Sequence, residues 1–217
     1  ISLTNDPGES FDGAEVTGDQ FVCDVEAIPA ADQYRPAMVH EKVLVEGPQT
    51  AEVVGPDGEE IYTDTHGRVK VQFHWDRKGE RDHRSSCWIR VSEPWAGKGW
   101  GGLQIPRIGQ EVVVDFLEGD PDRPIITGRV YNGNNRPPQD LPAGKMISGM
   151  RSKTYNGRGS NEITFDDTAG SQRMFMNAQY DQVVNVNNNR TTTVGIDSAE
   201  SIGNDMSLEV GNNSLEG

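Results

Sequence analysis

The polar run at residues 82–87 holds the residue types of a hydrolytic triad. Its members could in principle supply a nucleophile, a base and an orienting carboxylate: Asp82, His83, Ser85, Ser86 and Cys87. Triads are assembled from segments that lie far apart in the sequence, because one short loop rarely holds all three groups in the required geometry. We therefore interpret this run as a solvated loop and expect no catalytic residue in it.

Two adjacent carboxylates form a second candidate for chemistry. Asp166 and Asp167 could serve glycoside hydrolysis only if both faced the same scissile bond. Neighbouring residues instead point to opposite faces of a strand, or they lie in a turn. Aspartate favours turns because its side chain bonds nearby backbone groups. The pair therefore predicts a turn over residues 166–170, not an active site.

Metal and phosphate sites are also disfavoured by spacing. The four histidines, His40, His66, His74 and His83, show no ligand spacing, and no CxxC or HxH motif occurs. The stretch Gly97-Lys98-Gly99 lacks the remaining glycine and Ser/Thr of a phosphate loop and is interpreted as a strand connection. The triplets Gly-Asn-Asp at 203–205 and Gly-Asn-Asn at 211–213 resemble calcium-binding β-rolls, but those repeat every nine residues and have paired glycines. We expect no metal and no cofactor.

The C-terminal region repeats one pattern every eight residues. A β-branched apolar residue recurs at Val186, Val194, Ile202 and Val210, followed each time by Asn187, Gly195, Gly203 or Gly211. Neither helix nor strand periodicity produces eight, so the unit is one strand plus one turn. One octad has too few apolar side chains to fold alone and must stack on other strands. We expect the apolar set to fill the axis of an elongated β-structure shared between chains.

The residues that follow each apolar position are expected to form its corners. Glycine permits the sharp change of direction, and Asn187 is the non-glycine type that best tolerates positive φ. With layers about 4.8 Å apart, four octads would build roughly 20 Å of shaft.

Composition excludes several partner classes. The chain of 217 residues has a net charge of −14, and its first 40 residues hold eight acidic residues and one basic residue. Nucleic acid and anionic membrane surfaces are therefore disfavoured as main ligands. Cys23 and Cys87 are too few for a disulfide scaffold and are expected as thiols. The sequence contains no recognisable signal peptide and no run of about 20 apolar residues. Because the chain begins at Ile1 and its octads run up to the last residue, we interpret it as a piece of a longer protein.

Short alternating segments in the middle of the chain predict a small β-barrel. Residues 68–75 alternate, with Val69, Val71, Phe73 and Trp75 expected inward and Arg68, Lys70, Gln72 and His74 outward. Further strands are expected at residues 87–91, 110–117 and 124–131. About five short strands without a convincing amphipathic helix favour an all-β chain with an OB-fold barrel.

The organisation that follows has four parts. Residues 1–42 are interpreted as the end of a preceding domain, residues 43–132 as the barrel, and residues 133–145 as a polar, proline-rich linker. Residues 146–217 form the tail, which opens with strands at residues 163–165 and 174–178 before the octads begin.

An ordered set of motifs resembles the VgrG spike family of the bacterial type VI secretion system. These are EEIYTD at 59–64, GRVKVQFHWDR at 67–77, SCWIRV at 86–91, WAGKGWG at 95–101, IPRIGQEV at 105–112 and FLEGDPDRP at 116–124. The octads resemble that family's C-terminal needle and the triple-stranded β-helix of contractile phage tail spikes. The resemblance covers nearly the whole chain from residue 43.

The resemblance implies a homotrimer in which three OB barrels support an intertwined β-prism needle, with residues 1–42 belonging to a tail-hub-like region. It implies a mechanical, non-enzymatic role: a spike that sits on a tube ring protein, is thrust through a target membrane, and carries effectors. A tip-capping protein and an effector or adaptor would bind the needle. The spike would assemble in the cytoplasm and then be secreted.

Two other functions stay open at this point. The phage counterpart carries a lysozyme domain between barrel and needle, so a peptidoglycan-hydrolase tail hub is one alternative. This chain has only the linker at residues 133–145 in that place, which argues against hydrolysis. OB barrels also bind sugars or oligonucleotides between exposed aromatic residues, and Trp88, Trp95 and Trp100 could serve. The acidic balance and the resemblance favour packing roles for these tryptophans.

Overall fold

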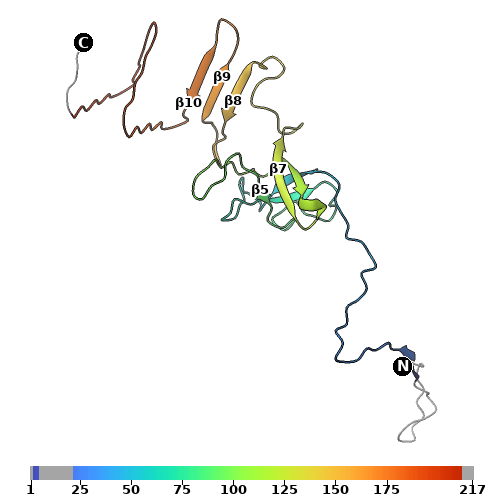
Figure 1. The fold of residues 1–217 in the computed structure, drawn as a ribbon. Coiled ribbons are helices and arrows are strands. Elements are labelled where there is room, and N and C mark those ends of the chain that lie inside the picture. The colour runs from blue at the N-terminus through green and yellow to red at the C-terminus, as the bar shows by residue number, and fades with distance from the viewer. Residues whose placement is uncertain (1, 5–21, 212–217) are drawn as a thin grey trace. The chain divides into compact units, whose positions relative to one another are not determined.

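The computed structural model describes residues 2–4 and 22–211, and within this part of the chain almost all regular structure is β (Figure 1). Two compact units are present, Ile1–Asn135 and Arg136–Gly217. Over the described residues, no helix has both the length and the apolar character needed to cross a bilayer.

The first unit contains a five-stranded sheet in the order β4-β3-β6-β7-β5. Its strands are β3 (Gln49–Val54), β4 (Lys70–Phe73), β5 (Arg90–Val91), β6 (Glu111–Phe116) and β7 (Pro124–Val130). Neighbours pair antiparallel except β5 and β7, which are parallel. The strands expected at residues 110–117 and 124–131 are confirmed by β6 and β7.

A single bridge closes this sheet into a barrel. Val69, just before β4, and Ile89, just before β5, exchange both backbone hydrogen bonds, at 3.0 and 2.8 Å. The bridge lies beside the two outer strands of the sheet, β4 and β5, so the five strands complete a circuit. A five-stranded Greek-key barrel closed in this way is the OB architecture that the sequence predicts.

The barrel interior is filled mainly by β-branched side chains, with alternate residues of each strand pointing inward. The buried cluster consists of Ala51, Val53, Val69, Val71, Ile89, Val112, Val114, Phe116 and Ile126. This cluster gives the unit a core of its own.

The expected alternation over residues 68–75 is correct for Val69 and Val71 but wrong at two positions. Trp75 is 66% exposed, because β4 ends at Phe73 and the chain turns there, with the Asp76 N–H donating to the Phe73 carbonyl. Gln72 is buried although it was expected outside. The 76–86 excursion covers it, and its Nε2 donates to the Asp76 carbonyl at 2.9 Å.

The connection from β6 to β7 anchors the segment that enters the barrel. It begins with the short 3-10 helix η1 (Leu117–Gly119), where Gly119 has φ +70°. The Gly119 carbonyl accepts from the Val45 N–H at 2.8 Å, and Lys42 pairs with Asp120 at 2.6 Å. The Lys42 ammonium lowers the pKa of Asp120. Upstream, β1 (Ser2–Thr4) and β2 (Val22–Asp24) form a separate antiparallel pair.

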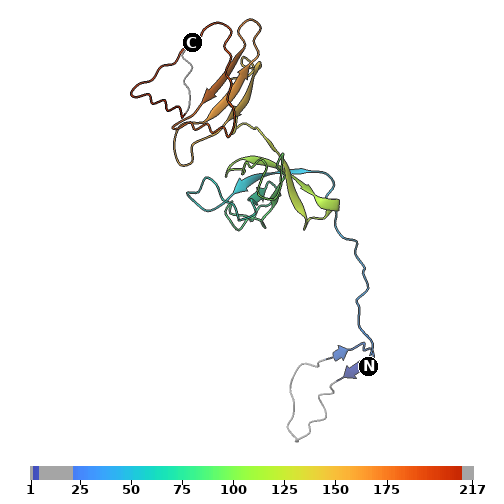
Figure 2. The ribbon, with the colours of Figure 1, turned by 60° about the vertical axis from the view of Figure 1, so that its left-hand side comes forward.

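The second unit opens with a three-stranded antiparallel sheet in the order β10-β9-β8 (Figures 1 and 2). Its strands are β8 (Ile147–Arg151), β9 (Glu162–Asp166) and β10 (Arg173–Asn177). β9 and β10 confirm the strands expected at residues 163–165 and 174–178, whereas β8 was not expected. Its central residue, Gly149, has no side chain and interrupts the alternation of apolar and polar residues by which a strand is recognised in the sequence. A Cβ there would overlap the Ile163 carbonyl oxygen, so only glycine fits this pairing.

Candidate interchain surface

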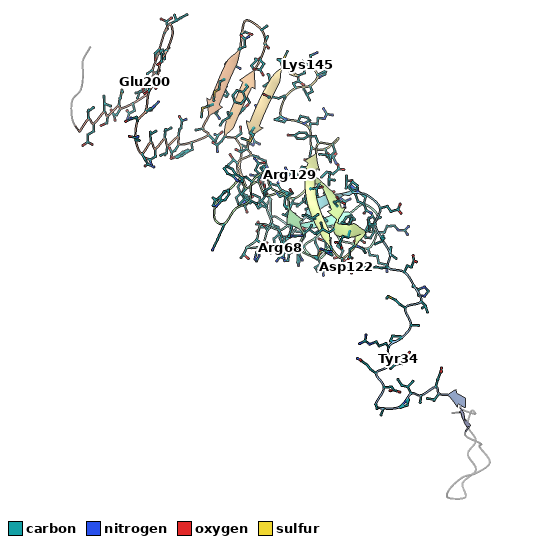
Figure 3. All side chains as sticks on the ribbon, in the orientation of Figure 1. Tyr34, Arg68, Asp122, Arg129, Lys145 and Glu200 are labelled. Carbon is teal, nitrogen blue, oxygen red and sulfur yellow. The ribbon has the colours of Figure 1, made fainter. Side chains whose placement is uncertain are left out.

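The octad tail is extended and bends at a fixed interval. From residue 178 to 211 no strand is assigned within the described chain, but bends occur at residues 179–180, 187–188, 195–196, 203–204 and 211. The bends therefore repeat every eight residues, and those from residue 187 on begin at the residues named as corners: Asn187, Gly195, Gly203 and Gly211. Figure 3 shows this part of the chain with Glu200 labelled.

The four octad apolar residues are the less exposed ones of the tail. Val186, Val194, Ile202 and Val210 are 44–50% exposed, whereas Val183, Ile196 and Leu208 are 79–92% exposed. Half of each octad side chain is thus uncovered in a single chain. Apolar surface that recurs at one repeat position and stays uncovered is typical of a contact with another chain.

In the single chain the residues expected at the corners do not have positive φ. Gly195, Gly203 and Gly211 all have φ outside the left-handed region, and Asn187 is not among the described residues with positive φ. The bends form without that conformation. A Cβ on any of the three glycines would meet nothing within 4 Å. Neither backbone conformation nor crowding within this chain therefore requires glycine there.

The polar run at residues 82–87 has no triad geometry. The Asp82 carboxylate accepts from the Arg84 N–H at 2.8 Å and from the Arg84 guanidinium at 2.7 Å, and these bonds lower the pKa of Asp82. The Ser86 hydroxyl accepts from the Val71 N–H and donates to the Cys87 carbonyl. These side chains form hydrogen bonds within the loop and from the loop to the barrel, as expected for a structural loop.

The remaining chemical candidates are also engaged in local structure. Asp166 accepts from the Thr168 hydroxyl at 2.6 Å and from its N–H at 3.0 Å, which lowers the pKa of Asp166 and confirms the turn. The Gly97 N–H donates to the Trp100 carbonyl and is not available to a phosphate. Over the residues described, no three His, Cys, Asp or Glu side chains gather as a metal site would require.

The three tryptophans considered for ligand binding divide into two kinds. Trp88 is half-buried, lies 4.9 Å from the Tyr62 ring and has the Lys70 ammonium 5.0 Å above it. Trp95 and Trp100 contact each other edge to face at 5.2 Å, at the end of a hairpin, but each is at least 60% exposed. A packing role therefore fits Trp88 fully and fits the other two only as a mutual pair.

Two family models match the chain in order. Residues 59–131 match the type VI secretion system/phage-baseplate injector OB domain, and residues 148–216 match the bacteriophage T4 gp5 C-terminal trimerisation domain. The first covers most of the barrel, and the second covers β8 to β10 and the octads.

Several curated proteins are similar over most of this chain. The type VI secretion system spike protein VgrG1b of Pseudomonas aeruginosa is 52% identical over 193 residues, which is 88% of this chain and 26% of that protein. VgrG1c of the same species is 50% identical over 188 residues, covering 85% and 26%. The actin cross-linking toxin VgrG1 of Vibrio cholerae is 43% identical over 206 residues, covering 91% and 18%.

The chain thus spans about a quarter or less of the length of these relatives. The region that it shares with them contains the OB barrel, the following sheet and the octad tail, in the order in which the two domain models match. On these grounds the chain belongs to the VgrG spike-protein family.

Proposed function

We propose that this chain is the barrel-and-needle part of a homotrimeric puncturing spike in a type VI secretion, or contractile injection, apparatus. One observation supports this most directly: an apolar residue every eight positions, each half exposed in a chain whose barrel already has a complete core. Such a tail gains its missing contacts only from further copies or partners. The match to a trimerisation domain supports three copies.

The needle would form from the octads of three chains. Val186, Val194, Ile202 and Val210 would fill its axis in successive layers, and Asn187, Gly195, Gly203 and Gly211 would form its corners. The backbone of each tail would pair with the tails of the other two chains, which leaves no free strand edge along the shaft. Dense hydrogen bonding between chains would give the stiffness that a thrust spike requires.

We propose the following division of the chain. Residues 1–42 end a tail-hub-like region, residues 43–132 form the OB base of the spike, residues 133–145 connect it to the tail, and residues 146–217 form the needle. The base would sit on a tube ring protein, and the tip would bind a capping protein and an effector or adaptor. Assembly would take place in the cytoplasm before secretion, and the target membrane would be contacted mechanically.

The proposed role involves no catalysis by this region. The side chains that could take part in catalysis, such as Asp82 and Asp166, are held in turns by hydrogen bonds from residues two positions later. The Vibrio cholerae relative is named as a toxin, but this chain covers only 18% of it. A zymogram on peptidoglycan tests the proposal, since a lytic band from this chain would contradict it.

Light scattering tests the assembly. The chain 1–217 is compared with a version that ends at Pro142, which keeps the barrel core intact. We expect a trimeric mass for the first and a monomeric mass for the second. A monomer in both cases would contradict the proposal.

A further inference from the structure

The chain contains two Asn-Gly pairs, and they lie in different environments. Asn132-Gly133 follows β7, whereas Asn156-Gly157 lies in the loop between β8 and β9. Asparagine before glycine is chemically reactive, because the glycine nitrogen can attack the side-chain carbonyl carbon, Cγ, and no Cβ on the glycine blocks the approach. In a folded protein the reaction requires that the asparagine side chain can turn toward that nitrogen.

The Asn132 side chain is held by three hydrogen bonds. Its Nδ2 donates to Glu111 Oε2 at 2.7 Å. Its Oδ1 accepts from the Asn134 N–H at 2.9 Å and from the Asn135 N–H at 2.8 Å. Asn132 is also half-buried. Turning its Cγ toward the Gly133 nitrogen would break these bonds, and leaving such groups without partners is costly.

Asn156 has none of these restraints. Its side chain is exposed, and neither this side chain nor the Gly157 N–H forms a hydrogen bond to any residue that the structure describes. The loop around the pair is nevertheless closed, since the Thr154 N–H donates to the Gly159 carbonyl at 3.0 Å. Asn156 has φ +50°, a left-handed conformation that aspartate also tolerates. The turn therefore accommodates asparagine and its acid equally.

We infer that Asn156 is a site of spontaneous deamidation in the folded protein and that Asn132 is protected from the same reaction. The Gly157 nitrogen, after losing its proton to hydroxide, attacks Asn156 Cγ and forms a new N–C bond. The bond from Cγ to Nδ2 breaks, and Nδ2 leaves as ammonia with a proton from water. Water then opens the resulting succinimide ring at either carbonyl, which gives aspartate or isoaspartate. Nothing is oxidised or reduced, and the only reactant besides the chain is water.

Both products place a carboxylate in a basic stretch of the chain. Residues 145–160 hold four basic residues and no acidic residue, and Arg158 lies two positions after Asn156. Isoaspartate also adds one carbon to the main chain of the loop. This addition lies outside the strand ladder, whose last pair before the loop is Arg151 with Glu162. We therefore expect the strands to keep their register while the loop gains one negative charge.

Peptide mapping of the unmodified chain tests the inference, because it needs no variant to fold. The chain is kept folded at mildly alkaline pH, and samples taken over time are digested and analysed by mass spectrometry. We expect Asn156 to deamidate roughly tenfold or more faster than Asn132, because Asn132 must first give up its hydrogen bonds. In urea, which removes these bonds, the two rates should agree within about threefold.

Two glycine variants check the route of the reaction. In Gly157→Ala the new Cβ lies 3.0 Å from Thr154 Cγ2, a methyl group at the end of a side chain, and φ is outside the left-handed region. The variant keeps Asn156 but places a side chain beside the attacking nitrogen, so its deamidation should slow by roughly tenfold. Gly133→Ala is the matched control, since its Cβ would meet nothing within 4 Å, and it should leave the Asn156 rate unchanged.

The outcomes are independent of the proposed assembly. Equal rates at Asn156 and Asn132 in the folded chain would overturn the inference, as would an Asn156 that reacts only in urea. An Asn156 rate that Gly157→Ala does not lower would overturn the proposed attack by the Gly157 nitrogen. Light scattering on the same samples reports the assembly separately, so a monomeric mass would contradict the proposed spike without changing this comparison.

Discussion

Val194→Asp is the most direct test of the proposed needle axis. Burying a valine side chain completely stabilises a protein by about 1.5–3 kcal/mol. Because Val194 is already half covered in one chain, roughly 1 kcal/mol per copy remains to be gained on assembly, or about 3 kcal/mol for a layer of three. The variant forfeits this gain and also places three carboxylates together in an apolar environment.

The charge term is the larger one. Each buried carboxylate without a partner costs several kcal/mol, even after local relaxation. We therefore expect the trimer to lose at least about 5 kcal/mol, which raises its dissociation constant by roughly a thousandfold or more. The effect should weaken as the pH falls toward 4, because protonation removes the charge.

Thr193→Asp is the matched control. It adds the same charge one residue away, where an extended chain directs the side chain to the opposite side. Sedimentation analysis over a dilution series measures both variants against the parent chain. Equal trimer stability for Val194→Asp and Thr193→Asp would refute the inward assignment of the octad residues.

Three further predictions concern the barrel. Ile89→Ala removes a fully buried side chain at the closing bridge and should cost about 2–5 kcal/mol of unfolding free energy, measured by urea titration of tryptophan fluorescence; a loss below about 1 kcal/mol would show that the bridge does not close a packed core. Desolvation alone would raise the pKa of Asp64, but hydrogen bonds from Arg68 and His66 lower it to about 2, so its contribution should be complete above pH 4 and lost as the pH falls toward 2. Asp64→Asn should therefore make the melting temperature less sensitive to acid between about pH 4 and pH 2. An unchanged dependence of the melting temperature on pH would show that the Asp64 carboxylate does not stabilise the barrel in this way. Gly119→Ala forces alanine to φ +70° with its Cβ 3.2 Å from the Val45 carbonyl oxygen and should destabilise by about 1–2 kcal/mol, whereas an unchanged melting temperature would show that the turn relaxes freely.

The alternation of apolar and polar residues predicts a barrel strand correctly where the alternate apolar side chains are the buried ones. Val69 and Val71 point inward because strand pairing fixes which face they share. Trp75 could not be placed this way, since the turn that ends β4 depends on the bond from Asp76 to Phe73. Gln72 is buried by a loop that lies later in the chain, and alternation within one strand carries no information about such a cover.

Of the apolar surfaces in the second unit, one could be predicted from the sequence and one could not. The octad residues could be predicted because their repeat is strict. The apolar face of β8-β9-β10 could not, because its members come from three strands and Gly149 obscures the first of them. The sequence does contain a signal, namely the alternation Met174, Met176 opposite Ile163, Phe165, but only the register shows that these residues share one face.

The two units of the chain bury apolar surface in different ways, and this difference bears on the mechanical role proposed. The barrel closes on itself through Val69 and Ile89 and has a core made by one chain. The tail leaves Val186 and its octad counterparts half exposed and forms no strand over residues 178–211. Its polar residues cannot compensate for the entropy of ordering so extended a segment, so in the proposed assembly rigidity there would have to come from contacts between chains. A shaft stabilised only in this way would be stiff once assembled, although residues 178–211 form no strand in the single chain.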